Sequence, residues 1–153
     1  MPGGPTRSIR DRRQALEAGQ HAFERGRLEE AISLLEQAVT LGADTAATRT
    51  MLGIACARQH QVERAFEHLE RAVALEREGF APRCALGELY MRLCVPEKAR
   101  EHLALALDHA TVPQERAYVQ SLLREERARD RRRIYRPSFR HPFWLLRRLR
   151  GGA

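Results

Sequence analysis

Three glycines recur at an interval of 34 residues, and the residues around them recur at the same interval. No insertion or deletion interrupts this interval across the three copies. The columns that share it hold small, apolar or acidic side chains: Gly19, Gly53 and Gly87; Ala31, Ala65 and Ala99; Leu35, Leu69 and Leu103; Ala38, Ala72 and Ala106; and Glu29, Glu63 and Glu97. A fixed period of this length predicts a solenoid, in which each repeat packs on its neighbours along the chain.

Each repeat contains two stretches with helical spacing of apolar residues, separated by a turn. In the first repeat the first stretch ends near Gly26, and Glu29 and Glu30 open the second stretch, where acidic side chains suit a helix N-terminus. Pro96 stands at the corresponding opening in the third repeat. Because small residues allow helices to approach closely, we expect the glycine column to face the alanine column of Ala31, Ala65 and Ala99.

These positions resemble the tetratricopeptide repeat (TPR), a 34-residue helix–turn–helix unit. Leu52-Gly53 and Leu86-Gly87 match its first helix, with Ala18-Gly19 as a weaker copy, and Tyr90 stands at its aromatic position. The early tryptophan and late proline of the family are missing. The resemblance covers residues 12–113 and implies an all-α solenoid of three repeats (12–45, 46–79 and 80–113). We expect a flexible N-terminus (1–11) before it, and after it a capping helix (114–133), because a solenoid needs its exposed end covered, and a basic aromatic tail (134–153).

Composition and charge favour a binding protein over an enzyme. The net charge of +7 is concentrated at the ends, because residues 124–150 contribute +8 whereas residues 14–123 contribute −4. No stretch is long and apolar enough for a membrane span or a secretory signal, and three cysteines without CxxC spacing fit a reducing compartment. No metal-binding motif, phosphate loop or nucleophile elbow is present. We therefore expect a cytoplasmic, non-enzymatic protein with no cofactor and no small-molecule substrate.

The resemblance implies a concave groove, lined by the first helices, that binds an extended or helical peptide. A chaperone-tail-binding TPR clamps a terminal carboxylate there, but Leu16, Gln20, Met51, Ala81 and Ala85 stand at the corresponding positions, so the clamp is absent. An apolar lining suits a partner segment that buries leucines or aromatics. The predicted groove residues are Arg13, Leu16, Gln20, Phe23, Thr50, Ile54, Arg58, Cys84, Glu88, Met91 and Arg92. Some of them could instead be ordinary core between helices.

Residues 131–153 carry eight arginines, no acidic residue and a cluster of large apolar side chains. The predicted contact residues are Arg131, Arg132, Arg133, Tyr135, Arg136, Phe139, Arg140, Phe143, Trp144, Leu145, Leu146, Arg147 and Arg148. Such a segment is either solvated or binds a partner, and we rank a protein first, an anionic membrane second and RNA third. The favoured function is an adaptor for an apolar peptide or helix. The alternatives are a peripheral membrane or RNA tether and a secretion-type TPR chaperone.

Overall fold

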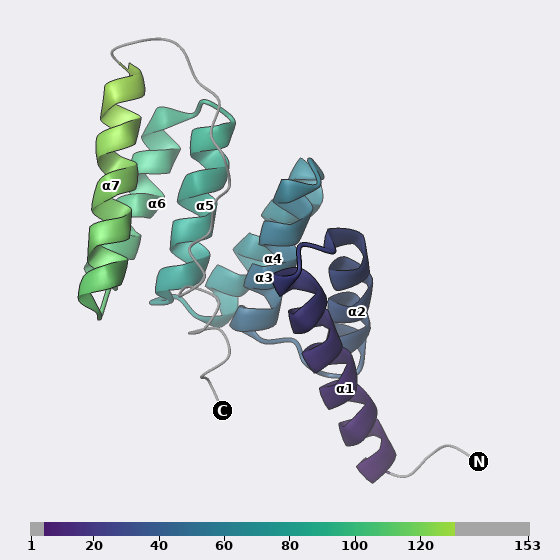
Figure 1. The fold of residues 1–153 in the computed structure, drawn as a ribbon. Coiled ribbons are helices and arrows are strands. Elements are labelled where there is room, and N and C mark those ends of the chain that lie inside the picture. The colour runs from purple at the N-terminus through teal and green to yellow at the C-terminus, as the bar shows by residue number, and fades with distance from the viewer. Residues whose placement is uncertain (1–4, 131–153) are drawn as a thin grey trace. The chain divides into compact units, whose positions relative to one another are not determined.

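The computed structural model describes residues 5–130, and these residues are entirely α-helices and short connections (Figure 1). The chain divides into two units at Leu75. The helices of the first unit are α1 (Pro5–Glu24), α2 (Leu28–Thr40), α3 (Ala46–Arg58) and α4 (Val62–Leu75). Those of the second unit are α5 (Phe80–Arg92), α6 (Pro96–Asp108) and α7 (Pro113–Asp130). The all-α fold of three helix pairs followed by one further helix is confirmed.

Helix α1 begins earlier than the repeat pattern indicates. It starts at Pro5, so the part of segment 1–11 from Pro5 onward is helical, where the sequence analysis expected a flexible segment. The residues from Thr6 to Asp11 include neither glycine nor proline, and a proline in the first turn of a helix sacrifices no hydrogen bond. A search for the 34-residue period cannot detect this part of the helix, because it lies before the first repeat.

Each helix pair is packed closely at the glycine column. A Cβ added at Gly19 would lie 2.9 Å from Leu35 Cγ, and one added at Gly87 would lie 2.6 Å from Leu103 Cγ. The glycines therefore face mainly the leucine column, and at Gly53 the expected alanine column as well, since an added Cβ would lie 3.2 Å from Ala65 O. The alanines Ala31, Ala65 and Ala99 are fully buried as well, so both columns belong to the interface within a pair.

The turn inside each helix pair repeats one backbone conformation with three different residues. Gly26, His60 and Cys94 share a register position, and their φ angles are 73°, 61° and 58°. The next residue closes the turn onto the first helix, as in Arg27 N to Ala22 O at 2.9 Å and Val95 N to Tyr90 O at 3.0 Å. Glycine adopts this left-handed conformation without a Cβ penalty, whereas histidine and cysteine do not.

A polar network connects the first two repeats within unit 1. Asp44 Oδ1 accepts a hydrogen bond from Arg49 Nε at 2.6 Å, and Arg49 Nη1 lies 3.1 Å from His68 Nδ1. Glu36 of α2 pairs with Arg64 of α4. Burial, and then the charge of Arg49, lower the pKa of His68, while the hydrogen bond from Arg49 lowers the pKa of Asp44. These contacts join α2 to the following pair.

Helix α7 completes the core of unit 2. Val119 and Leu122 are buried with residues of α5 and α6, and Tyr118 and Leu123 pack against the same cluster. The buried Glu115 accepts a hydrogen bond from Thr111 N at 2.9 Å, which caps the start of the helix. The predicted capping helix does pack on the last repeat, and its residues 131–133 lie outside the described residues.

Candidate protein-binding surface

Helix α1 presents an accessible stripe that includes three of the predicted groove residues. Arg13 is exposed, and Leu16 and Gln20 are half-buried. Ile9, which lies in the part of α1 before the first repeat, is 54% exposed and stands seven residues before Leu16. Residues at this spacing lie on the same face of a helix. The stripe therefore consists of Ile9, Arg13, Leu16 and Gln20: two apolar side chains, a cation and an amide. Arg13 Nε donates to Glu17 Oε1 at 2.7 Å.

Most of the other predicted groove residues are buried. Six side chains keep less than a tenth of their surface exposed: Phe23, Thr50, Ile54, Cys84, Glu88 and Met91. Thr50 Oγ1 donates to Ala46 O at 2.7 Å, so its hydroxyl is used within its own helix. A buried side chain can contact a partner only if the atoms that cover it move. Of the remaining two, Arg58 is exposed at the end of α3 and Arg92 is half-buried at the end of α5.

In unit 2 the structure brings Glu88 of α5 together with Tyr118 of α7. Tyr118 Oη donates to Glu88 Oε1 at 2.8 Å, and Cys84 Sγ lies 3.8 Å from the same oxygen. Burial, with a smaller contribution from the negative charge of Glu125 on α7, raises the pKa of Glu88 to about 8 even though the hydrogen bonds from Tyr118 and Cys84 lower it. Burial also raises the pKa of the Tyr118 phenol and of the Cys84 thiol. Sequence reasoning placed Glu88 in the groove but missed Tyr118 as its partner.

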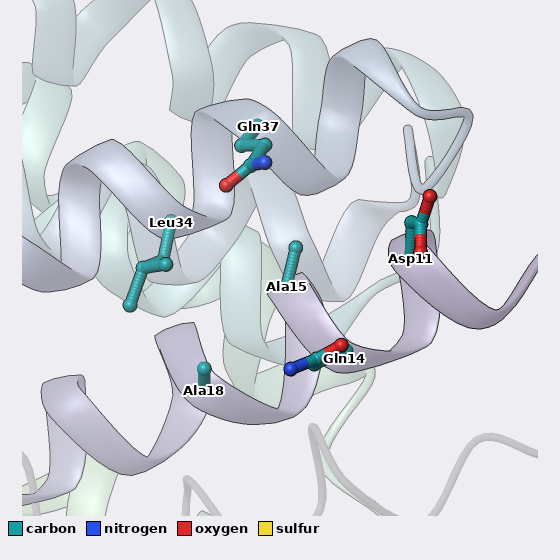
Figure 2. Close-up of a pocket in the computed structure, with 6 residues that line it drawn as sticks. All are labelled: Asp11, Gln14, Ala15, Ala18, Leu34 and Gln37. Carbon is teal, nitrogen blue, oxygen red and sulfur yellow. The ribbon is translucent and has the colours of Figure 1, made fainter. Parts of the chain in front are cut away.

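A hollow of about 280 Å³ lies between α1 and α2, where sequence reasoning predicted nothing (Figure 2). It is lined by Asp11, Gln14, Ala15, Ala18, Leu34 and Gln37. The repeat alignment contains the signal for it, because Ala18 stands in the column of Leu52 and Leu86, which are buried. Ala15 likewise stands in the column of Arg49 and Arg83. Smaller side chains in the first repeat leave this space unfilled.

The predicted tail contacts, Arg131 to Arg148, lie outside the described residues. Within residues 5–130, no three histidine, cysteine, aspartate or glutamate side chains gather as metal ligands would. No helix in the same part of the chain combines the length and the hydrophobicity that a bilayer-crossing helix needs. Three cysteines are free: Cys56 and Cys84 are buried, and Cys94 is exposed.

The fold matches solved TPR domains over most of the chain. The TPR domain of P58(IPK) aligns with a TM-score of 0.69 and 22% identity over 80% of this chain, which spans only 34% of that protein's chain. The first TPR domain of RPAP3 (Spaghetti), solved with the HSP90 peptide SRMEEVD, also gives 0.69, with 20% identity over 78% of this chain and 92% of that one. The Arabidopsis OM64 TPR domain aligns with a TM-score of 0.68 and 14% identity, over 77% of this chain and 98% of that domain's chain.

No family model and no curated protein matches the sequence. At identities between 14% and 22% the structural likeness establishes the fold alone. TPR domains are in general non-catalytic binding modules. The 34-residue period, the helix pairs and the structural neighbours together establish that this chain has the tetratricopeptide-repeat fold.

Proposed function

We propose that this chain is a non-enzymatic scaffold that binds an apolar peptide or helix of a partner protein on the accessible face of α1. The observation that carries the proposal is the stripe from Ile9 to Gln20, in which Ile9 and Leu16 lie on the same side of the helix and remain accessible. An amphipathic partner helix buries apolar anchors at such a spacing. Arg13 and Gln20 beside them offer polar contacts that orient the partner.

The chemistry of the stripe favours an apolar ligand over a terminal carboxylate. The RPAP3 domain was solved with a peptide that contains three acidic residues, SRMEEVD. In this chain the positions that correspond to a carboxylate clamp hold Leu16, Gln20, Met51, Ala81 and Ala85. None of these side chains carries a positive charge that would attract a carboxylate. We therefore propose a partner segment that contributes leucine or aromatic side chains.

Affinity capture with paired variants tests this proposal. Leu16→Glu places a charge at the centre of the stripe, and Ser33→Glu places the same charge on an exposed position of α2. We expect Leu16→Glu to lose at least about tenfold of the captured partner, because burying an unpaired carboxylate opposes apolar contact. Ser33→Glu should retain it. Equal capture by both variants, with unchanged helicity in circular dichroism, would show that the partner binds elsewhere.

A further inference from the structure

A carboxyl group lies inside the contact between α5 and α7. Glu88 of α5 keeps only 6% of its surface exposed. Its Oε1 atom accepts a hydrogen bond from Tyr118 Oη of α7 at 2.8 Å, and Cys84 Sγ of its own helix lies 3.8 Å away. Because an ionised carboxylate loses its hydration on burial and neutral donors compensate only in part, this position favours the protonated acid.

Among the described residues, the titratable groups that act on Glu88 are Cys84 of α5 and Tyr118 and Glu125 of α7. Burial raises the pKa of the Cys84 thiol and of the Tyr118 phenol, so both groups remain neutral donors. Glu125 adds a negative charge, which disfavours a second one on Glu88. While α7 is in place, the Glu88 carboxyl therefore keeps its proton at neutral pH.

Helix α7 can leave this contact more easily than α5 can. Most residues of α5 are buried, whereas the buried residues of α7 follow one face of the helix: Glu115, Val119, Leu122 and Glu126. It lies at the edge of unit 2, beside α6, and residues 109–112 connect the two helices (Figure 1). A helix that packs on one side only opens at a lower cost in free energy than a whole domain unfolds.

We propose that α7 is a pH-dependent cap, which packs on α5 while the Glu88 carboxyl is protonated and is released as that carboxyl ionises. Release removes Tyr118 and opens Glu88 to water, where a carboxyl group ionises in its ordinary range. The packed form therefore binds a proton that the released form does not. Packing is strongest below about pH 4.5 and weakens as the pH rises, by up to tenfold per pH unit, until the effect levels off near pH 8.

Release of α7 uncovers apolar surface on α5 and α6. Phe80, Met91 and Leu103 belong to the same buried cluster as Val119 and Leu122 of α7. A dye that fluoresces on exposed apolar surface, such as ANS, therefore reports the released form. The inference concerns unit 2 and depends neither on the α1 stripe nor on any partner protein.

Hydrogen–deuterium exchange of the full chain, read by mass spectrometry from about pH 5 to about pH 9, tests the proposal. Because exchange itself accelerates with pH, the protection of α7 is expressed relative to an unstructured peptide of the same sequence. We expect this protection to fall by up to tenfold per pH unit and to level off near pH 8. Helix α5, which also packs on α6, should keep its protection, and ANS fluorescence should rise over the same range.

Two substitutions test the role of Glu88, and a third serves as control. Glu88→Gln should remove the pH dependence, because the amide carries no charge and its oxygen still accepts the hydrogen bond from Tyr118. Glu63→Gln makes the same change at an exposed position of α4 and should leave the dependence intact. If Glu88→Gln does not fold, Tyr118→Phe decides. The Tyr118 hydroxyl lowers the pKa of Glu88, so its removal should make the protection level off at a higher pH.

Three results would overturn the proposal. One is a wild-type α7 whose corrected protection does not change with pH. Another is a pH dependence that persists in Glu88→Gln or, if that variant does not fold, an unchanged profile in Tyr118→Phe. The third is an equal loss of protection in α5 and α7, which would show that unit 2 unfolds as a whole. The Leu16→Glu experiment does not involve α7, so the two proposals fail independently.

Discussion

Two pairs of residues at the same register positions behave differently in the two units. Gln20 of α1 and Thr50 of α3 in unit 1 correspond to Glu88 of α5 and Tyr118 of α7 in unit 2. Thr50 donates its hydroxyl to Ala46 O in its own helix, whereas Tyr118 reaches across and donates to Glu88 at 2.8 Å. Gln20 stays half-buried and Glu88 is buried. The repeat register thus places a residue along a helix, while the size of the facing side chain decides what that residue contacts.

The largest effect should come from the glycine column, where the two units are most alike. Gly87→Val would force a side chain to within 2.6 Å of Leu103, and Gly19→Val would meet Leu35 at 2.9 Å. We expect losses in the free energy of unfolding of about 3 and about 2 kcal/mol, because overpacking displaces helices that cannot relax freely. Urea denaturation measures both. Ala104→Val, at an exposed position of α6, should remain within about 0.5 kcal/mol of the wild type.

If Gly19→Val and Gly87→Val leave the free energy of unfolding unchanged, the helix pairs are not in the close contact described. If only Gly87→Val is destabilising, the side chain of Leu35 can move away from the new valine, whereas that of Leu103 cannot. The hollow beside Ala15 and Ala18 lies between the same two helices, α1 and α2, and would give Leu35 this room. The α1–α2 pair would then accommodate a larger side chain more readily than the α5–α6 pair.

The cross-helix hydrogen bond of unit 2 gives the next effect in size. Tyr118→Phe removes the donor to Glu88 and leaves a buried carboxyl group with one fewer hydrogen bond. We expect a loss of about 2 kcal/mol in the free energy of unfolding. Thr50→Val, the counterpart in unit 1, removes a hydroxyl that bonds only within its helix and should change stability by less than about 1 kcal/mol. Equal losses in the free energy of unfolding for Tyr118→Phe and Thr50→Val would mean that the two hydroxyl groups contribute alike to stability.

Sequence periodicity predicts the helix pairs because every repeat needs small residues at the same close contact. It also predicts the packing of α7, since Val119 and Leu122 continue an apolar helical face. It does not predict the start of α1 at Pro5, which lies before the repeats. The Glu88–Tyr118 bond also escapes it, because Tyr118 lies after the last repeat. For Ile54 and Cys84 the sequence leaves both the groove and the core open, and the structure buries them, because register fixes a position and not the atoms that cover it.

A pH-dependent effect should appear in unit 1, where His68 occupies the column that holds Leu34 in the first repeat. Its pKa is lowered from 6.5, mainly by burial and then by Arg49. The unfolded chain therefore binds a proton at His68 that the folded chain does not, so stability is lost as pH falls below about 6.5, by at most about 1.4 kcal/mol per pH unit. His68→Leu should flatten this dependence in urea denaturation between pH 7 and pH 5. An unchanged slope would place the responsible group elsewhere.

The smallest effect should come from the turns inside the helix pairs. Cys94 in unit 2 has a φ of 58° at the position that Gly26, with a φ of 73°, and His60, with a φ of 61°, hold in the two turns of unit 1. Because a Cβ disfavours this conformation, Cys94→Gly should stabilise the chain by about 0.5–1 kcal/mol, and Gly26→Ala should destabilise it by a similar amount. No atom lies within 4 Å of a Cβ added at Gly26, so the loss would report backbone conformation alone. If the two substitutions change the free energy of unfolding by similar amounts with opposite signs, the two turns differ only in the residue placed there. Stabilisation by Gly26→Ala would mean that the turn adopts a different conformation in solution.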